Sequence, residues 1–477
     1  MSFNFATPLF HVFNQVQRLL ALGLLLVLGA CTIGPHYETP EVQVGTEFKQ
    51  LNGQGEGWRP SAPQPVEKQW WQVFDDPRFE SWLTELIERN ASLEQAQARH
   101  RAAQAALQGA RSSFWPQLGA QSSVRRSGTG RLSPETQYNV NTSVSWELDV
   151  WGRVRQQVEG SQAQLAASEA DLAGVELSLI STFLQSYFQY QNTQALLQLY
   201  EQTIDIYQHS LEITKNRYAV GMVARSDVDS AVAQLENARA QHENARRQLE
   251  QLEHALVVLL GQAPSVRAFE AQSRAYSLPE MPVTIPSALL ERRPDIVAAE
   301  RRVAAANAEI GVAQTAWFPE FNFSLEGGYR SSSWSEWITT PARFWSLGPA
   351  LALSIFDGGA RRSRVEQARA QYDETAARYR ETVLEALQEV EGLFSDWRSL
   401  QAEERIQQRA LEAARSALRS MREQYETGLV DYLSLAQVET NTLSTEQAML
   451  NLKNEQLQTA VRLFTALGGG WQESTGS

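Results

Sequence analysis

The residue of this sequence best suited to covalent chemistry is Cys31, the only cysteine among 477 residues. A lone cysteine excludes an internal disulfide. The apolar run at residues 19–30 precedes it directly, too short to cross a bilayer as a helix but suited to the core of a secretion signal. Leu28, Gly29 and Ala30 before the cysteine resemble a bacterial lipobox, in which the thiol is acylated. We therefore expect a signal peptide over residues 1–30 and a lipid anchor on Cys31; the alternative is a free thiol beside a chance apolar run.

Other reactive side chains show no catalytic spacing. The sequence has no HExxH, GxSxG or GxxxxGK[ST] motif, and no CxxC or Cys/His cluster that could hold zinc. Five spread-out methionines give no support for soft-metal transport. The sequence predicts no enzyme, no cofactor and no metal site. The histidines considered are scattered: His36, His100, His209, His242 and His254.

The net charge of −13 and the pI near 5.2 argue against a nucleic-acid partner, because phosphate binding needs clustered Lys and Arg. Here the arginines are interleaved with glutamates along expected helices, which is typical of solvated helix faces.

The longest uninterrupted pattern lies between Arg153 and Tyr218. It has no proline, and its apolar residues follow a seven-residue repeat with one four-residue step, the pattern of a coiled-coil helix with a stutter. At about 1.5 Å per residue such a helix is roughly 100 Å long, so it must pack against other long helices. The repeat comprises Val158, Leu165, Leu172 and Leu179, then Phe183, Tyr190, Leu197, Ile204, Leu211 and Tyr218.

Several short motifs occur twice, in the same order and at nearly the same separation. Each half therefore predicts a helix, two strands, a very long helix, a tight turn and a second long helix. We expect an opening helix from Asp76 to Ser112 in the first half and one starting near Pro294 in the second. The motif pairs begin at Trp115 and Phe318, Asp149 and Asp357, Tyr218 and Tyr425, and Leu260 and Leu467.

The domain boundaries follow from this duplication. We expect an extended segment over residues 31–75, a first repeat over 76–261, an irregular linker over 262–292, a second repeat over 293–468 and a tail over 469–477. The strand pairs are expected at about 116–151 and 319–357. The long helices are expected over 153–217 and 361–424, and their partners over 226–260 and 431–467.

The expected strands alternate between apolar and polar residues. From Tyr138 to Val150 one face is apolar and the other polar, and Phe321 to Tyr329 and Trp345 to Ile355 repeat the pattern; Leu118 to Val124 is weaker. An ordinary half-solvated sheet is one reading. Strands longer than ten residues with aromatic ends instead favour a membrane barrel. Four strands cannot close a barrel, so two, three or four copies of the chain would be needed.

Together these features resemble the outer-membrane factor family, the TolC-like channels of tripartite export systems, in its lipoprotein branch. The resemblance rests on the Gly34-Pro35-His36-Tyr37 start, Trp70-Trp71, Arg293-Pro294-Asp295, Phe356-Asp357-Gly358-Gly359 and the two Tyr-x-x-Gly turns. It implies a trimer with a 12-stranded β-barrel continuous with a periplasmic α-helical barrel. It also implies a location in the outer membrane, anchored by lipid, and passive conduction from an inner-membrane pump and a periplasmic adaptor to the exterior.

The resemblance also assigns functional residues. It maps adaptor contacts onto the two hairpin tips and a periplasmic constriction onto Leu433 and Gln437. Because members commonly have Asp where this chain has Gln437, Asp431, or Asp227 and Asp229, are alternative sources of acidic lining, and each is equally suited to capping a helix. The tip residues are Val220, Gly221, Met222, Thr427, Gly428 and Leu429.

A second class of function remains open from the residues alone. A lipid-anchored coiled-coil scaffold or adhesin of the cell envelope would also use Cys31 and the long helices, with the strands forming a soluble cap. The transported substrate and the identity of the pump and adaptor leave no signal in the sequence.

Overall fold

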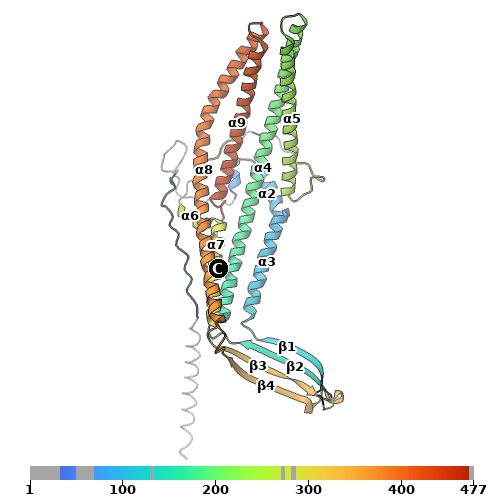
Figure 1. Cartoon of the computed structure of the whole chain (residues 1–477), viewed down its shortest axis with the longest axis vertical. Helices are drawn as coiled ribbons and strands as arrows, with labels where there is room; N and C mark the ends of the chain where they lie inside the picture. The colour runs from blue at the N-terminus through green and yellow to red at the C-terminus, as the bar shows by residue number, and fades with distance from the viewer. Residues whose placement is uncertain are drawn as a thin grey trace, which may run out of the picture. The chain divides into compact units, whose positions relative to one another are not determined.

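A computed structural model describes residues 33–49, 69–128, 130, 134–269, 274, 276–280 and 286–471 (Figure 1). The expected signal peptide, Cys31 and residues 472–477 lie outside the described residues. The chain packs into two compact units, each built from both halves of the sequence. The first contains described residues of 33–41, 99–169 and 298–380, and the second those of 42–98, 170–297 and 381–471.

Helices account for most of the described chain. No helix in this part combines the length and hydropathy that a bilayer crossing requires. The α-helices are α2 (Arg78–Arg89), α3 (Ala91–Ser112), α4 (Arg153–Ala219), α5 (Arg225–Leu259), α6 (Pro286–Arg292), α7 (Pro294–Thr315), α8 (Ala360–Glu426) and α9 (Tyr432–Ala466), with 3-10 turns η2 (Trp70–Phe74), η3 (Trp334–Glu336) and η4 (Thr340–Ala342).

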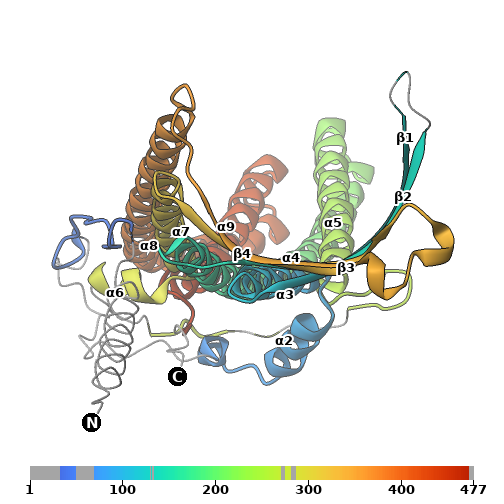
Figure 2. The ribbon, with the colours of Figure 1, turned by 90° about the horizontal axis from the view of Figure 1, so that it is seen from below.

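The first unit contains one antiparallel sheet with strand order β1-β2-β3-β4, seen as a curved ribbon in Figure 2. Its register puts apolar side chains in rows across all four strands: Leu118 pairs with Val144, Val144 with Leu325 and Leu325 with Leu347. Leu118 is 74% exposed and Trp345 is 73% exposed. The strands are β1 (Gln117–Ser127), β2 (Glu135–Glu147), β3 (Glu320–Ser331) and β4 (Arg343–Ala352).

Strands β2 and β4 end earlier than the alternation predicts, at Glu147 and Ala352. An aspartate that binds the start of the next helix explains each shortening. Asp149 accepts hydrogen bonds from the amides of Val154 at 2.9 Å and Arg155 at 3.0 Å. The carboxylate of Asp357 accepts one from the amide of Arg361 at 3.1 Å in the same way. These caps satisfy free helical amides, so the chain leaves the sheet there.

The expected opening helix from Asp76 to Ser112 is two helices, α2 and α3, separated at Asn90. Asn90 has an extended backbone, and its side-chain oxygen accepts hydrogen bonds from the amides of Ser92 at 2.9 Å and Leu93 at 3.3 Å. Its side-chain amide donates to the carbonyl of Leu259 at 2.9 Å. The prediction of a single helix was therefore wrong. Apolar periodicity continues through the break, so the sequence pattern gave no sign of it.

The turns between the long helices are the same structure twice. In the first, the amide of Met222 donates to the carbonyl of Arg217 at 2.9 Å; in the second, Leu429 donates to Gln424 at 2.9 Å. Each turn has a glycine in the left-handed region, Gly221 at φ +76° and Gly428 at +80°. This is the Schellman arrangement, which favours glycine because a side chain strains that conformation.

A second pair of glycines holds the end of each hairpin against the last residue of a helix, Arg89 of α2 for the first hairpin and Arg292 of α6 for the second. Gly261 has φ +73° and Gly468 has φ +95°. A Cβ atom on Gly261 would lie 2.3 Å from the carbonyl oxygen of Arg89, and one on Gly468 would lie 2.4 Å from that of Arg292. At both positions any residue other than glycine would have a strained backbone. Its Cβ atom would also clash with a backbone carbonyl oxygen, which cannot move away as a flexible side chain could.

Gly468→Ala is expected to destabilise the second unit by roughly 2 kcal/mol or more, since strain at positive φ and a steric clash add. Thermal unfolding of the purified protein would measure the loss. Gly109→Ala is the control, because Gly109 lies inside α3 with nothing within 4 Å of the added Cβ. It should be neutral or slightly stabilising. Equal melting temperatures for the two variants would contradict the prediction.

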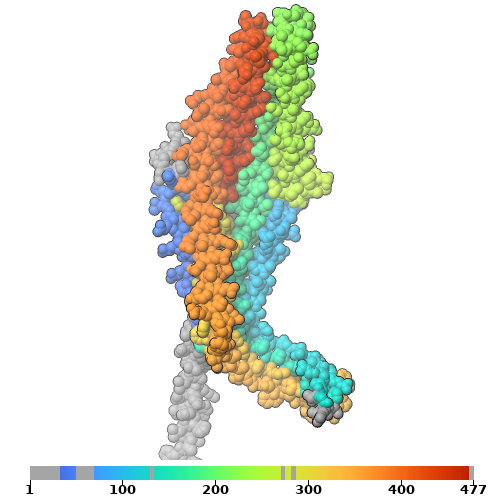
Figure 3. Space-filling model, in the orientation of Figure 1, coloured from blue at the N-terminus to red at the C-terminus, as the bar shows by residue number. Residues whose placement is uncertain are grey.

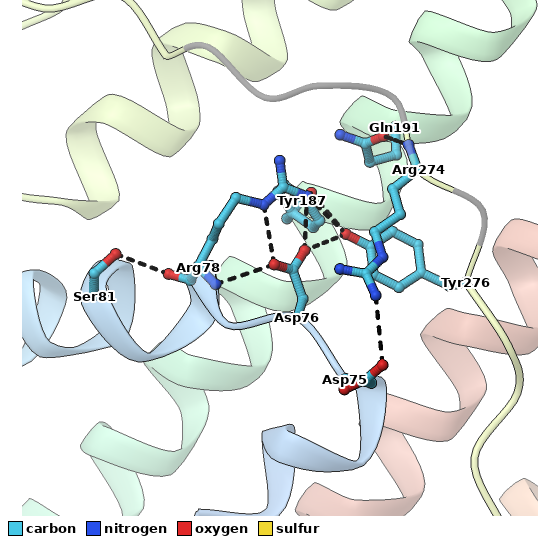
Figure 4. A network of polar contacts seen from close by, with 8 residues as sticks. All are labelled: Asp75, Asp76, Arg78, Ser81, Tyr187, Gln191, Arg274 and Tyr276. Carbon is cyan, nitrogen blue, oxygen red and sulfur yellow. Dashed lines mark hydrogen bonds and ion pairs between the residues drawn. The ribbon is translucent and has the colours of Figure 1, made fainter.

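A polar network ties the linker between the halves to the helices of the second unit (Figure 4). Arg78 donates to Asp76 through Nε at 3.0 Å and a terminal nitrogen at 2.7 Å, and Tyr276 of the linker donates to the same carboxylate at 2.5 Å. The Tyr187 and Tyr276 hydroxyls lie 2.8 Å apart. Burial opposes ionisation of Asp76, but these hydrogen bonds outweigh it and lower its pKa to about 2. The charged network therefore holds the linker in place at any physiological pH.

Candidate functional site

The tips of the two long hairpins lie at the top of the view in Figure 3. They carry apolar side chains that are exposed to solvent. Val220 and Met222 are 72% and 71% exposed, and Leu429 is 76% exposed. Thr427 does not offer a free hydroxyl, because it donates to the carbonyls of Glu423 and Gln424, each at 3.0 Å. Small glycine turns flanked by exposed apolar residues give a surface that another protein's helices can approach closely.

Directly below the tips, four helices share one buried core. Two tyrosines lie at its centre: Tyr425 and Tyr432 are each 1% exposed, with ring centroids 6.0 Å apart. The core brings together both hairpins of the second unit, so the tips are held by mutual packing. Its members are Tyr207 and Leu211 of α4, Val228, Ala231, Leu235 and Ala238 of α5, Tyr425 of α8, and Tyr432 and Leu435 of α9.

Polar contacts join α4 to α8 beside this core. The hydroxyl of Tyr425 lies 2.7 Å from that of Thr214. Arg217 donates to the backbone carbonyls of Tyr425 at 2.5 Å and Glu426 at 3.1 Å, and its guanidinium lies 4.5 Å from the centroid of the Tyr425 ring. These contacts cross between the hairpins, so separating the tips would break them.

An acidic group lies inside the same region. Glu439 of α9 is 3% exposed and faces Ser210 of α4 at 3.3 Å, Gln234 of α5 at 3.4 Å and Arg422 of α8 at 3.7 Å. Burial raises the pKa of Glu439 to about 7, although Arg422 and the two hydrogen bonds oppose that shift. The sequence alone does not single out Glu439, because only its position on the apolar side of α9 distinguishes it from the exposed glutamates.

The two residues predicted to form a constriction lie on the other face of α9. Leu433 and Gln437 are both exposed and one turn apart, whereas Leu435 and Glu439 are buried. Asp431 is the N-cap of α9, and its carboxylate accepts a hydrogen bond from the amide of Ser434 at 2.9 Å. Hydrogen bonding from the side chain of Ser434, and then from its amide, lowers the pKa of Asp431.

The two other acidic candidates are also engaged locally. Asp227 accepts a hydrogen bond from the amide of Ala224 at 3.2 Å, and Asp229 forms an ion pair with Arg225 at 3.2 Å. Asp431 and Asp227 therefore cap the starts of helices. The side chains of Leu433 and Gln437 are exposed, as residues that line a passage would be.

The described N-terminal segment begins at the junction of strands and helices in the first unit. The amide of Ile33 donates to the carbonyl of Trp151 at 3.2 Å, just before α4 begins. Tyr37 donates to the carboxylate of Glu300 at 2.5 Å. Cys31 lies outside the described residues. Ile33, two residues after it, is held next to the N-terminal end of α4, where the strands join the helices.

Comparisons with known proteins match nearly the whole chain to outer-membrane proteins. A family model described as "Outer membrane efflux protein" matches residues 82–262 and 285–469. The chain is 30% identical to the probable efflux pump outer membrane protein TtgC of Pseudomonas putida, over 97% of each chain. It is also 30% identical to the outer membrane protein OprJ of Pseudomonas aeruginosa, over 95% of this chain and 96% of that one. The solved outer-membrane channel OprN is 31% identical, covers 93% of this chain and all of its own, and superposes with a TM-score of 0.84.

Proposed function

This chain belongs to the outer membrane efflux protein family, and from that membership we propose in detail how it conducts its cargo. It is an outer-membrane component of an efflux system, as the sequence predicted. The fold class is likewise confirmed as mainly α with a transmembrane β part. The scaffold or adhesin alternative is not adopted, because the family and the relatives are efflux proteins.

The protein acts as the passive outer section of the conduit, with no catalytic step of its own. Three copies of the four-stranded sheet close one barrel of twelve strands. The observation that carries this proposal is the sheet itself. Its apolar face is largely exposed to solvent in the single chain, and within the described residues its edge strands β1 and β4 have no further strand beside them. In hydrocarbon each unpaired backbone group costs several kcal/mol, so closure is required.

The two repeats, 76–261 and 293–468, supply equivalent hairpins to a helical tunnel in the periplasm, with the linker 262–292 at its waist. A periplasmic adaptor docks on the tips formed by residues 220–222 and 427–429, where exposed apolar side chains surround a glycine turn. Leu433 and Gln437 narrow the passage from their exposed face of α9. An inner-membrane pump loads the tunnel and selects the substrate.

Conductance and mass of the purified protein test this function together. The expected result is a trimer that conducts weakly when isolated, because the core beneath the tips holds them together, and conducts more after the adaptor binds. A monomer that does not conduct under any condition would refute the channel. A wide ohmic pore in the isolated protein would refute the closed resting state.

Cys31→Ala is expected to remove the acyl anchor without releasing the protein from the membrane. Two or more acyl chains bind a bilayer firmly, but a closed barrel is held by its own apolar surface. Fractionation with and without detergent, beside mass spectrometry of the N-terminal peptide, would measure both effects. Acyl mass on the wild-type peptide is the positive control. Its absence would refute lipidation, and a soluble Cys31→Ala variant would refute the barrel.

A further inference from the structure

The two faces of the sheet differ in charge as well as in hydropathy. On the polar face lie all the acidic residues of the four strands and two arginines. On the apolar face the charged residues of the strands are Arg126 in β1 and Arg343 in β4. The polar face holds Glu135, Glu147, Glu320, Glu326, Arg125 and Arg330.

Both arginines lie at the loop end of their strands. Arg126 is the last residue but one of β1, and Arg343 is the first residue of β4. Both are exposed. The aromatic residues Tyr329, which pairs with Arg343, and Trp345 lie on the same face. Aromatic rings beside basic residues mark the level at which a barrel meets lipid headgroups.

The strand order places these arginines at the two edges of the sheet. Because β1 and β4 are the edge strands, closing a barrel from copies of the chain sets β4 of one protomer beside β1 of its neighbour, with antiparallel order maintained. Arg343 and the neighbouring copy's Arg126 then lie on the outer surface of one seam, both at the end away from the helices. This step rests on the proposed function, because a single chain has no seam.

We propose that these paired arginines bind the phosphate groups of a phosphorylated glycolipid of the outer leaflet, of the lipid A class. An arginine facing lipid needs an anionic partner, and its planar guanidinium matches the geometry of a phosphate oxygen pair. Within the four described strands, no carboxylate lies on that face to compete for it. A headgroup that carries two phosphates offers one to each protomer, so one bound lipid bridges the seam.

Titration of the full-length trimer with bis-phosphorylated lipid A in phosphatidylcholine nanodiscs tests the site, with native mass spectrometry counting bound lipids. Arg126→Gln and Arg343→Gln should each weaken binding roughly fivefold, and the double variant about twenty-five-fold. Lipid A without phosphates should bind the wild type as weakly as the double variant does. Inorganic phosphate should not compete, because the acyl chains supply much of the affinity.

Arg125→Gln is the matched control, because Arg125 adjoins Arg126 but lies on the polar face. It should leave lipid affinity unchanged. Equal weakening by Arg125→Gln would overturn the proposal in favour of general attraction by positive charge, and so would unchanged affinity in the double variant. If the double variant does not assemble, the lipid affinities of the two single variants test the proposal, and unchanged affinity in both would overturn it.

The same preparations separate this inference from the function on which it rests. A wild-type chain that forms no trimer and no conducting channel would refute the proposed function. A conducting trimer whose double variant holds lipid A as tightly as the wild type would refute the lipid site alone.

Discussion

Leu347→Arg is expected to abolish assembly of the channel in the outer membrane. Leu347 lies midway along β4 and pairs with Leu325, in the apolar row that crosses the sheet. An arginine near the middle of a lipid-facing strand costs about 2–4 kcal/mol, and a trimer incurs that cost in every copy. The trimer should disappear from outer-membrane fractions, and efflux that depends on the protein should be lost with it.

Ser346→Arg is the control for this prediction, since Ser346 is the preceding residue and points to the polar face, where it pairs with Glu326. It should assemble normally, because an arginine there lies in water beside a carboxylate. Normal assembly of Leu347→Arg would place the apolar face away from lipid. Loss of both variants would show only that β4 tolerates no large residue at this level.

Glu439→Gln is expected to stabilise the packed tips at pH 8 by up to about 3 kcal/mol. Burial raises the pKa of Glu439 from 4.5 to about 7, so the tip core favours the protonated acid. Below pH 4.5 the folded and the opened states are both protonated. Between 4.5 and 7 the folded state alone keeps the proton, so its stability falls as the pH rises. Above pH 7 Glu439 is ionised in the folded state as well, so the full cost of its buried charge is present. The uncharged amide of Glu439→Gln does not incur this cost.

The raised pKa of Glu439 also predicts how the channel responds to pH. Opening the tips exposes Glu439 to water, so the wild-type channel should open more often as the pH rises from 5 to 8. The groups around the carboxylate are Arg422 of α8, Ser210 of α4, Gln234 of α5, and the buried tyrosines Tyr207 of α4 and Tyr432 of α9. Serine and glutamine side chains do not titrate, and burial raises the pKa of both tyrosines, so Glu439 sets the response between pH 5 and 8.

Two measurements at matched pH test this prediction. Hydrogen exchange in the first turns of α9 should be slower in Glu439→Gln than in the wild type at pH 8, and equal at pH 4. Single-channel opening in the variant should not change between pH 5 and 8. Glu426→Gln, a change at an exposed glutamate near the same tip, should behave as the wild type. A variant whose opening still follows pH would exclude Glu439 as the responsible group.

The large features of this molecule were predictable because local patterns determine them. The seven-residue repeat between Arg153 and Tyr218 predicted a helix that the structure has from Arg153 to Ala219. Alternation predicted which residues share each face of the sheet, because side chains of a strand point alternately to its two sides. The duplicated glycines predicted two equivalent turns, and Gly221 and Gly428 both have the positive φ that such turns need.

Interruptions of those patterns were harder to see. The break at Asn90 and the early ends of β2 and β4 all depend on one polar side chain that accepts hydrogen bonds from helix amides. The same residue types also occur on solvated surfaces, so apolar periodicity carries no sign of the difference.

What the sequence by itself determined is the class of this protein: its repeats, its strand faces, its hairpin turns and its resemblance to outer-membrane efflux channels. Only the tertiary structure decided which polar residues matter at the tips. Glu439 resembles any other helical glutamate until α4, α5 and α8 surround it, and Asp431 resembles a pore-lining acid until it caps α9. The reason is physical: periodicity reports on which side of an element is apolar, whereas a pKa or a cap depends on groups brought together from distant parts of the chain.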